Sequence, residues 1–225
     1  MEERTIISSS QDVPQPPQRE LDERRKTVLQ VGRIITDEQQ SLCLLRVIGA
    51  AGVMAHVTTP LSAGQPVAVG FRSSHCILGQ VSWVRDQLVG IEFERPVDLE
   101  TMLVMQRRAI GGQFLPESVR LDVYGTAAIE LEGPPIVTEL FDISLAGAKI
   151  ANMPELPTGT HVTVVIEGLP HRSGSVRWKR DGRSGIAFHL AMPFDMLSAW
   201  ALRQRPRTTL AAIRAMDESG PGTPV

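Results

Sequence analysis

The chain has 225 residues, which is enough for one large domain or two small ones. With 42% hydrophobic and 21% charged residues it has the balance of a globular protein, and a formal net charge of −2 argues against a general DNA or RNA binder. No segment is apolar over the length that a membrane span requires, and two cysteines are too few for a disulfide scaffold or a zinc site, so the sequence predicts a reduced, cytoplasmic protein with no membrane span.

The N-terminal residues differ in composition from the rest of the chain. Residues 1–23 carry six acids against two arginines, together with clusters of serine and proline. Such a segment cannot bury enough apolar surface to offset the entropy lost on ordering. We therefore expect a disordered arm over residues 1–23, followed by a first strand over Thr27–Ile35.

Most of the remaining chain is an internal repeat. When the sequence is shifted by 95 residues, 14 of the 43 positions in 51–93 are identical to their partners in 146–188. Random pairing gives about three identities, and the period is longer than the roughly 20–50 residues of solenoid repeats. The repeat predicts a duplicated domain, with one copy over residues 24–108, the second over 109–205, and a C-terminal tail over 206–225.

Each copy has the pattern of short strands joined by turns. Val67–Val69 and Val162–Val164 are β-branched runs, and residues 79–84 and 174–179 alternate apolar with polar side chains. In both alternating segments valine and tryptophan are two residues apart, which predicts that they share one face of the sheet. Asp181-Gly182 follows the second segment and favours a tight hairpin turn. Short strands at this spacing are typical of a small barrel or sandwich.

A helical pattern follows each copy. Asp98 is a suitable N-cap for an amphipathic segment that ends at Arg107 and Arg108, and Asp195 is a suitable N-cap after the second copy. A weaker helix is expected over Thr209–Met216. The apolar stripes of these helices are typical of packing against a core rather than of a cofactor site.

The second copy contains a motif of polar residues at the start of a strand. Asp142, Ser144 and Gly147 form the pattern Asp-x-Ser-x-x-Gly, and Arg120 precedes the first strand of this copy. Together with the Gly-x-Val-x-Trp hairpin and the Gly-Ile-x-Phe strand that follow, the motif resembles the PilZ family. The resemblance implies an all-β fold of two tandem PilZ-like six-stranded β-barrels, each followed by an α-helix.

Many PilZ domains bind cyclic di-GMP in bacteria, so the resemblance implies this ligand at Arg120 and the motif residues. A guanidinium pairs with a phosphate or forks onto the O6/N7 edge of guanine. The Asp142 carboxylate accepts hydrogen bonds from guanine N–H groups, and the Ser144 hydroxyl adds one more contact. Gly147 lets a base approach the backbone closely.

The arginine arm of the family is incomplete in this chain. In the family, two arginines in the pattern Arg-x-x-x-Arg precede the first strand. Arg120 matches the second of them, and the first falls on Pro116, which has no guanidinium. Arg107 and Arg108 have two interpretations: they supply the absent guanidinium after Gly111-Gly112 folds back, or they form the basic last turn of the preceding helix, favoured by its dipole.

The first copy departs further from the motif. Its counterparts of Asp142 and Ser144 are Val47 and Gly49, and only the glycine, Gly52, remains. The basic run at residues 24–26 is either a solvated edge or a source of arginines for the ligand of the second barrel. We expect the first copy to be a docking or partner-binding barrel. Since Trp83 and Trp178 recur in both copies, we expect them to pack the barrels rather than stack a base.

Two functions are compatible with these features. The first is a non-catalytic sensor or adaptor that binds cyclic di-GMP and changes the angle between its barrels or its contact with a protein partner. The second is a ligand-independent interaction module, in which Asp142 and Ser144 satisfy backbone donors. No acid–base or nucleophile set converges, so we expect no enzyme, no metal and no cofactor. The sequence identifies neither the protein partner nor the oligomeric state.

Overall fold

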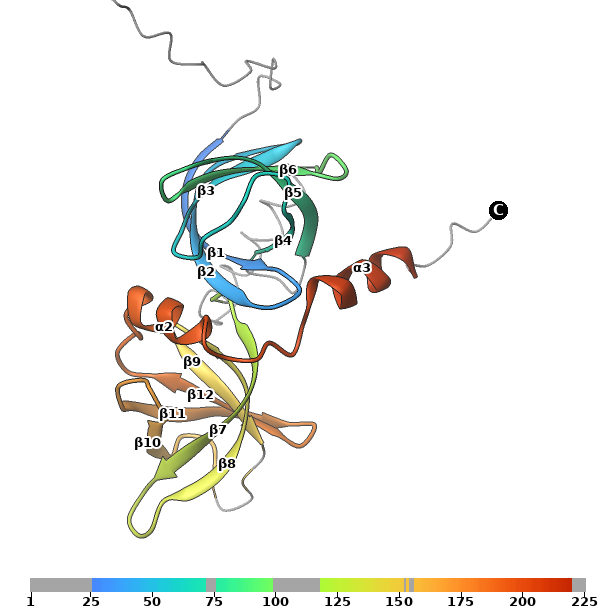
Figure 1. The fold of residues 1–225 in the computed structure, drawn as a ribbon. Helices are drawn as coiled ribbons and strands as arrows, with labels where there is room; N and C mark the ends of the chain where they lie inside the picture. The colour runs from blue at the N-terminus through green and yellow to red at the C-terminus, as the bar shows by residue number, and fades with distance from the viewer. Residues whose placement is uncertain (1–25, 72–75, 99–117, 152, 154–155, 220–225) are drawn as a thin grey trace, which may run out of the picture.

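Six antiparallel strands close into a barrel in each half of the chain (Figure 1). The structure, a computed structural model, describes residues 26–71, 76–98, 118–151, 153 and 156–219. The strands of the first barrel, joined in the order β1-β2-β3-β6-β5-β4, are β1 (Lys26–Ile35), β2 (Gln40–Gly49), β3 (Gly52–Val57), β4 (Pro66–Gly70), β5 (Cys76–Arg85) and β6 (Leu88–Phe93).

The second barrel repeats the first in strand order. Its strands are joined as β7-β8-β9-β12-β11-β10, and each begins 95 or 96 residues after its counterpart. They are β7 (Leu121–Glu130), β8 (Ile136–Ser144), β9 (Gly147–Ala151), β10 (His161–Val165), β11 (Arg172–Arg180) and β12 (Arg183–Phe188). The predicted duplication and the all-β fold of two tandem barrels are therefore confirmed.

Two short helices follow the second barrel. The helix α2 (Phe194–Ala201) begins one residue before Asp195, which lies in its first turn, so the prediction of Asp195 as N-cap is wrong. Pro193 holds the cap position because its fixed φ suits a helix start. The helix α3 (Leu210–Glu218) begins after Thr209, whose side chain accepts a hydrogen bond from the Ala212 amide. The helix predicted between Asp98 and Arg108 lies outside the described residues.

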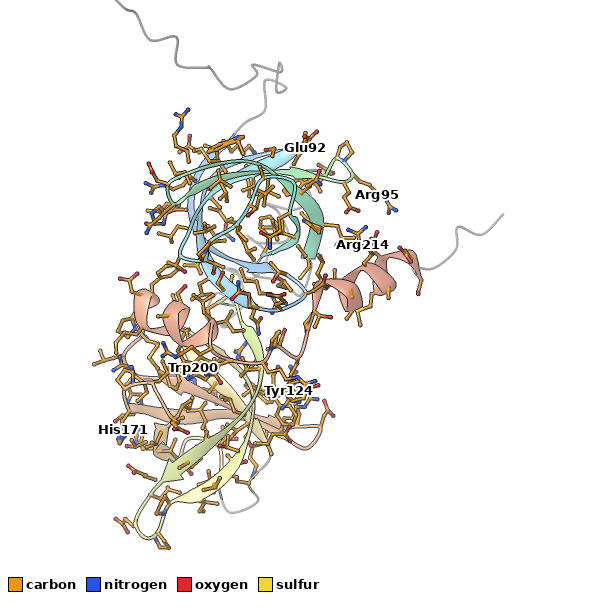
Figure 2. All side chains as sticks on the ribbon, viewed as in Figure 1. Glu92, Arg95, Tyr124, His171, Trp200 and Arg214 are labelled. Carbon is orange, nitrogen blue, oxygen red and sulfur yellow. The ribbon has the colours of Figure 1, made fainter. Side chains whose placement is uncertain are left out.

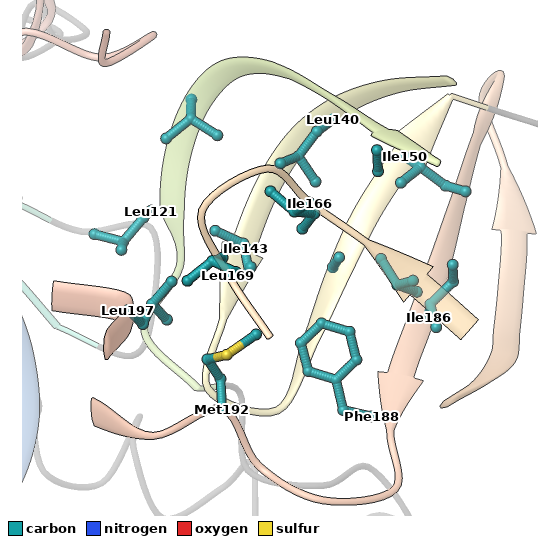
Figure 3. Close-up of a cluster of buried hydrophobic side chains, with 14 of the residues drawn as sticks. Leu121, Leu140, Ile143, Ile150, Ile166, Leu169, Ile186, Phe188, Met192 and Leu197 are labelled. Carbon is teal, nitrogen blue, oxygen red and sulfur yellow. The ribbon is translucent and has the colours of Figure 1, made fainter. Parts of the chain in front are cut away.

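The interior of the second barrel is filled by aliphatic side chains that alternate along its strands (Figure 3). Leu197 and Trp200 of α2 close one end of this core, and the Trp200 indole N–H donates to the Glu167 carbonyl at 2.9 Å. Leu42 of β2, in the first barrel, is fully buried in the same cluster. The two barrels are therefore packed against each other through apolar contacts.

The segment predicted as a C-terminal tail contains α3, which packs on the first barrel. Leu210 and Ile213 are buried in a cluster with Ile35, Ala68 and Leu78. The chain thus crosses from α2, at the second barrel, to α3 beside the first (Figure 1). Figure 2 shows Arg214 on the side of α3 that faces the first barrel, where its guanidinium pairs with Glu94 at 2.6 Å.

The prediction that valine and tryptophan share one face of the hairpin strand is wrong. Val176 pairs with Ile186, whereas Trp178 pairs with Gly185, so β11 has one extra residue between them. This β-bulge shifts the alternation, because Val176 is buried inside the barrel while Trp178 covers the outer side of Gly185. The first barrel has the same bulge, with Trp83 over Gly90.

The tight turn between β11 and β12 is confirmed. Asp181 and Gly182 have φ angles of 51° and 68°, which is the left-handed pair that a type I′ hairpin turn requires. Among the described residues, no helix is both long enough and apolar enough to cross a membrane.

Cys43 is expected to be unreactive in the folded protein. Burial raises the pKa of its thiol to about 12, so at pH 8 its thiolate is about 1,000-fold scarcer than that of an ordinary exposed cysteine. In a Cys76→Ser variant, a thiol reagent should therefore label Cys43 only after denaturation. Fast labelling of the native variant would contradict this. Because the raised pKa favours the neutral thiol, the contribution of Cys43 to stability is lost as the pH rises from about 9 towards 12.

Candidate functional site

A buried carboxylate with two cationic partners lies on the outer side of the second barrel. The Asp142 side chain is 2% exposed, and its Oδ1 accepts from the Arg120 guanidinium at 2.6 Å. Its Oδ2 is paired with the Lys149 ammonium. A buried carboxylate is stable only when it is paired in this way. The cluster therefore carries one net positive charge, with the Arg120 side chain 38% exposed and available to a ligand.

The backbone explains why Asp142 points outward. Leu140 of β8 pairs with Ile150 of β9 and Asp142 pairs with Lys149, so Phe141 is an extra residue that forms a β-bulge. Leu140 faces the core, and the bulge resets the alternation so that Asp142 is on the outer side. The register aligns Asp142 with Asp122 on β7 and with Lys149 on β9.

Trp178 extends this outer row onto β11. Lys149 pairs with Gly185 on β12, and Gly185 pairs with Trp178. The Arg180 guanidinium lies 5.0 Å from the centre of the Trp178 ring. The row from Asp142 to Trp178 thus combines a carboxylate, an ammonium and an indole on one surface of the sheet.

Ser144 is used by the backbone of its own turn. Its hydroxyl donates to the Gly147 carbonyl at 3.2 Å and accepts from the Ala146 amide at 3.3 Å, and the residue is fully buried. This is a local side chain–backbone turn between β8 and β9. The serine therefore shapes the loop next to Asp142.

Gly147 is explained by the closure of the barrel. A Cβ at this position would lie 2.2 Å from the Ile186 carbonyl oxygen of β12. Gly52, its counterpart in the first barrel, meets the Ile91 carbonyl oxygen in the same way at 2.4 Å. The first barrel lacks the aspartate and the serine but keeps the glycine and its close approach. The glycine is therefore required by strand packing in both barrels.

The site borders the junction of the two barrels. The guanidinium of Arg33, on β1, donates to the Arg120 carbonyl at 2.7 Å and to the Asp122 carboxylate at 2.6 Å. The Gln40 side-chain amide donates to the Asp122 carbonyl. Burial acts to lower the pKa of Arg33, but Asp122 and Cys76 outweigh it, so the pKa lies above its ordinary value. Arg33 is therefore a permanent cation that joins the first barrel to Arg120 and Asp122 of the second.

Comparison of the two copies distinguishes residues that the barrel fold requires from residues that it does not require. The glycines and tryptophans recur at matched positions, whereas Asp142 and Lys149 are replaced by Val47 and Met54 in the first barrel. Val47 and Met54 pair with each other in the same register as the charged pair. The fold therefore does not need these charges, and their presence in one barrel alone makes the pair a candidate for a role beyond folding.

The structure brings together Arg120, Asp142, Ser144 and Gly147, as the motif predicts, while Arg107 and Arg108 lie outside the described residues. Lys149 and Arg33 were not predicted. Lys149 could have been found from the repeat, because a lysine there replaces an apolar residue of the first copy. Arg33 carries no sequence signal, since it reaches the site only through the packing of two barrels.

No group of three or more histidine, cysteine, aspartate or glutamate side chains is arranged to hold a metal ion within the described part of the chain. The charged groups of the site are its two cations and its carboxylate. A positive cluster with one shielded acceptor suits an anionic ligand that also carries N–H donors.

Comparison with known proteins gives a match for the second barrel. Residues 116–199 match the PilZ domain. A search of curated proteins found no match.

Three solved structures illustrate what the whole chain is similar to. One is PlzA of Borreliella burgdorferi in complex with c-di-GMP, with 11% identity, a TM-score of 0.33, and coverage of 81% of this chain and 95% of that chain. Another is the inhibitor of motility MotI (DgrA) of Bacillus subtilis, with 15% identity, a TM-score of 0.32, and coverage of 79% of this chain and 97% of that chain. A third is YcgR of Escherichia coli in complex with c-di-GMP, with 11% identity, a TM-score of 0.26, and coverage of 84% of this chain and 81% of that chain.

Proposed function

Because residues 116–199 form a PilZ domain, we propose that the second barrel binds cyclic di-GMP and that the protein is a sensor or adaptor rather than an enzyme. The observation that carries this proposal is the cluster of Arg120, Asp142 and Lys149. Asp142 and Lys149 occupy positions that are apolar in the first barrel, Val47 and Met54, although the two barrels share their strand order, whereas the counterpart of Arg120 in the sequence is the basic residue Arg25.

The ion pairs suggest how the ligand binds. In the free protein Arg120 neutralises Asp142. A phosphate of the ligand takes over the exposed guanidinium, and the released Asp142 oxygen accepts the N1–H and N2–H donors of a guanine. Lys149 remains paired with the carboxylate. Every polar group that the exchange uncovers gains a new partner, so little desolvation energy is lost.

Titration with cyclic di-GMP tests the proposal. We expect calorimetry to give a dissociation constant on the order of 1 µM, and the tryptophan fluorescence to change in parallel. A Trp178→Phe variant should lose most of the fluorescence change, because Trp178 lies in the outer row with Lys149. The matched Trp83→Phe variant should keep it. Folded wild-type protein that releases no heat at roughly 100 µM ligand would refute the proposal.

We also propose that ligand binding changes the junction between the barrels. Arg120 holds Asp142 with its side chain and accepts Arg33 with its carbonyl oxygen, so the ligand and the first barrel contact the same residue. Asp122 pairs with Arg33 and lies beside Asp142 in the strand register. A movement of Arg120 towards a phosphate therefore shifts an acceptor of Arg33, and this differential contact allows the ligand to select one arrangement of the barrels.

An Arg33→Met variant tests this coupling, since methionine keeps an apolar stem and removes the guanidinium. Small-angle scattering is expected to report a ligand-dependent change in the wild-type protein and little change in the variant. The affinity for cyclic di-GMP should stay within about threefold, because Arg33 contacts the Arg120 backbone and not its guanidinium. An equal scattering change in both proteins would disprove the coupling and leave the ligand site intact.

The alternative function is a ligand-independent interaction module. It is favoured by Ser144, whose hydroxyl is bonded to its own turn. In such a module the motif is structural, and both barrels bind protein partners. The variant of Asp142 described in the Discussion distinguishes the two functions.

A further inference from the structure

A ladder of alternating guanidinium groups and aromatic rings borders the Asp142 site. Its two aromatic rings belong to Phe141 and Tyr124. The guanidinium of Arg183 lies 4.4 Å from the centre of the Phe141 ring, and that of Arg207 lies 4.8 Å from the same centre and 4.3 Å from the centre of the Tyr124 ring. Arg205 lies 5.5 Å from the Tyr124 centre and ends the ladder.

The middle of the ladder is held firmly. Arg207 donates to the carbonyl oxygens of Val123 and Leu140, at 2.5 and 3.2 Å, and pairs with Glu139 at 2.5 Å. Its own amide donates to the Asp122 carbonyl at 2.9 Å. Arg207 is therefore committed to the β7–β8 backbone, and its role is to fix the two rings.

The two ends of the ladder differ in their distance from the ligand site. Arg183 and Arg205 are both exposed. Arg183 stacks on Phe141, the bulged residue next to Asp142, and lies two residues along β12 from Gly185, which pairs with Lys149. Two residues of a strand span about 7 Å. Arg205 instead stacks on Tyr124 of β7, the ring that Arg207 also contacts (Tyr124 is labelled in Figure 2).

The first barrel has no such ladder among its described residues. The positions of Tyr124, Phe141 and Arg183 are occupied there by Leu29, Arg46 and Leu88, respectively. The ladder therefore accompanies the charged cluster of the second barrel and is not needed for the shared fold.

We propose that Arg183, stacked on Phe141, is a cyclic di-GMP contact that provides the second guanidinium of the site, in place of the arm arginine whose position is Pro116. This rests on the proposed function. A guanidinium whose plane is fixed by an aromatic ring loses little entropy when it forks onto the O6/N7 edge of a guanine or onto a phosphate. Its surface face can also stack on a base. Arg120 and Arg183 then grip the ligand from two sides of Asp142.

Calorimetry with cyclic di-GMP on the full chain tests this assignment. Arg183→Ala is expected to weaken binding 10- to 100-fold, and Arg183→Lys to recover only part of the loss, since lysine keeps the charge but not the planar fork. Two matched variants should bind within about twofold of wild type: Arg205→Ala, at the other end of the ladder, and Arg46→Ala, at the equivalent bulge of the first barrel.

The outcomes separate this inference from the proposed function. If wild-type protein binds and Arg183→Ala binds equally well with an unchanged thermal unfolding midpoint, the assignment of Arg183 is wrong and the ligand site stands. Equal losses in Arg183→Ala and Arg205→Ala would also overturn it, because they would indicate a general charge effect. If wild-type protein binds no cyclic di-GMP, the proposed function and the assignment both fail.

Discussion

Replacement of Asp142 by alanine is expected to weaken cyclic di-GMP binding at least 100-fold, which corresponds to ~2.7 kcal/mol. The substitution removes the acceptor of the guanine N–H groups, and hydrogen bonds to a charged group contribute about 1.5–3 kcal/mol each. Arg120 and Lys149, which share this carboxylate, also lose their common partner. Calorimetry measures the loss of affinity, and urea unfolding measures the accompanying loss of stability.

The stability of the same variant distinguishes the sensor from the interaction module. The two cations are 38% and 25% exposed in their side chains, so water can solvate them and we expect a destabilisation of only about 1–2 kcal/mol. Val47→Ala, at the matched position of the first barrel, should leave binding unchanged. If Asp142→Ala unfolds, Asp142→Asn keeps the shape of the side chain and answers the same question. Full affinity in a folded Asp142 variant would show that this carboxylate is not a ligand contact, whereas a loss of stability well above this range would favour the module.

Replacement of Gly147 by alanine is expected to lower the free energy of unfolding by about 2–3 kcal/mol, the range for overpacking a close-packed site. The added Cβ would lie 2.2 Å from a backbone oxygen of β12, and a strand in a closed barrel cannot move away from its neighbour. Gly52→Ala should cost a similar amount, because it meets the same obstacle in the first barrel.

Gly125→Ala is the matched control for this prediction. It lies on β7 of the same barrel, and its added Cβ would meet only Leu140 Cδ2, at the ordinary distance of 3.8 Å. We expect a change within about 0.5 kcal/mol. Urea midpoints of the three variants provide the comparison. Equal midpoints for the Gly147 and Gly125 variants would contradict the assignment of Gly147 to the packing of the barrel.

These two predictions assign different roles to members of one motif. Asp142 is expected to act mainly on affinity and Gly147 mainly on stability. The distinction follows from the duplication, since the glycine is present in both barrels and the aspartate in one. We therefore expect the motif to combine a structural turn with a charged ligand contact.

Features that depend on neighbouring residues could be predicted from the sequence. The strand β1, the hairpin turn at Asp181-Gly182 and the helix after Thr209 all follow from local backbone preferences, and the structure confirms them. The duplication was also visible, because identical residues recur at a constant shift. The prediction failed for Trp178, because a β-bulge changes which face a residue occupies and leaves no mark in the alternation itself.

The amino-acid sequence by itself determined that two similar barrels form and that only the second carries Asp142. It could do so because alternation and turn chemistry act over a few residues, and because the motif lies on one hairpin. Only the tertiary structure decided that Arg33 reaches Arg120, that Arg207 stacks between two rings, and that α3 packs on the first barrel. These contacts join residues 60 or more positions apart, and their geometry depends on how one closed barrel packs against the other.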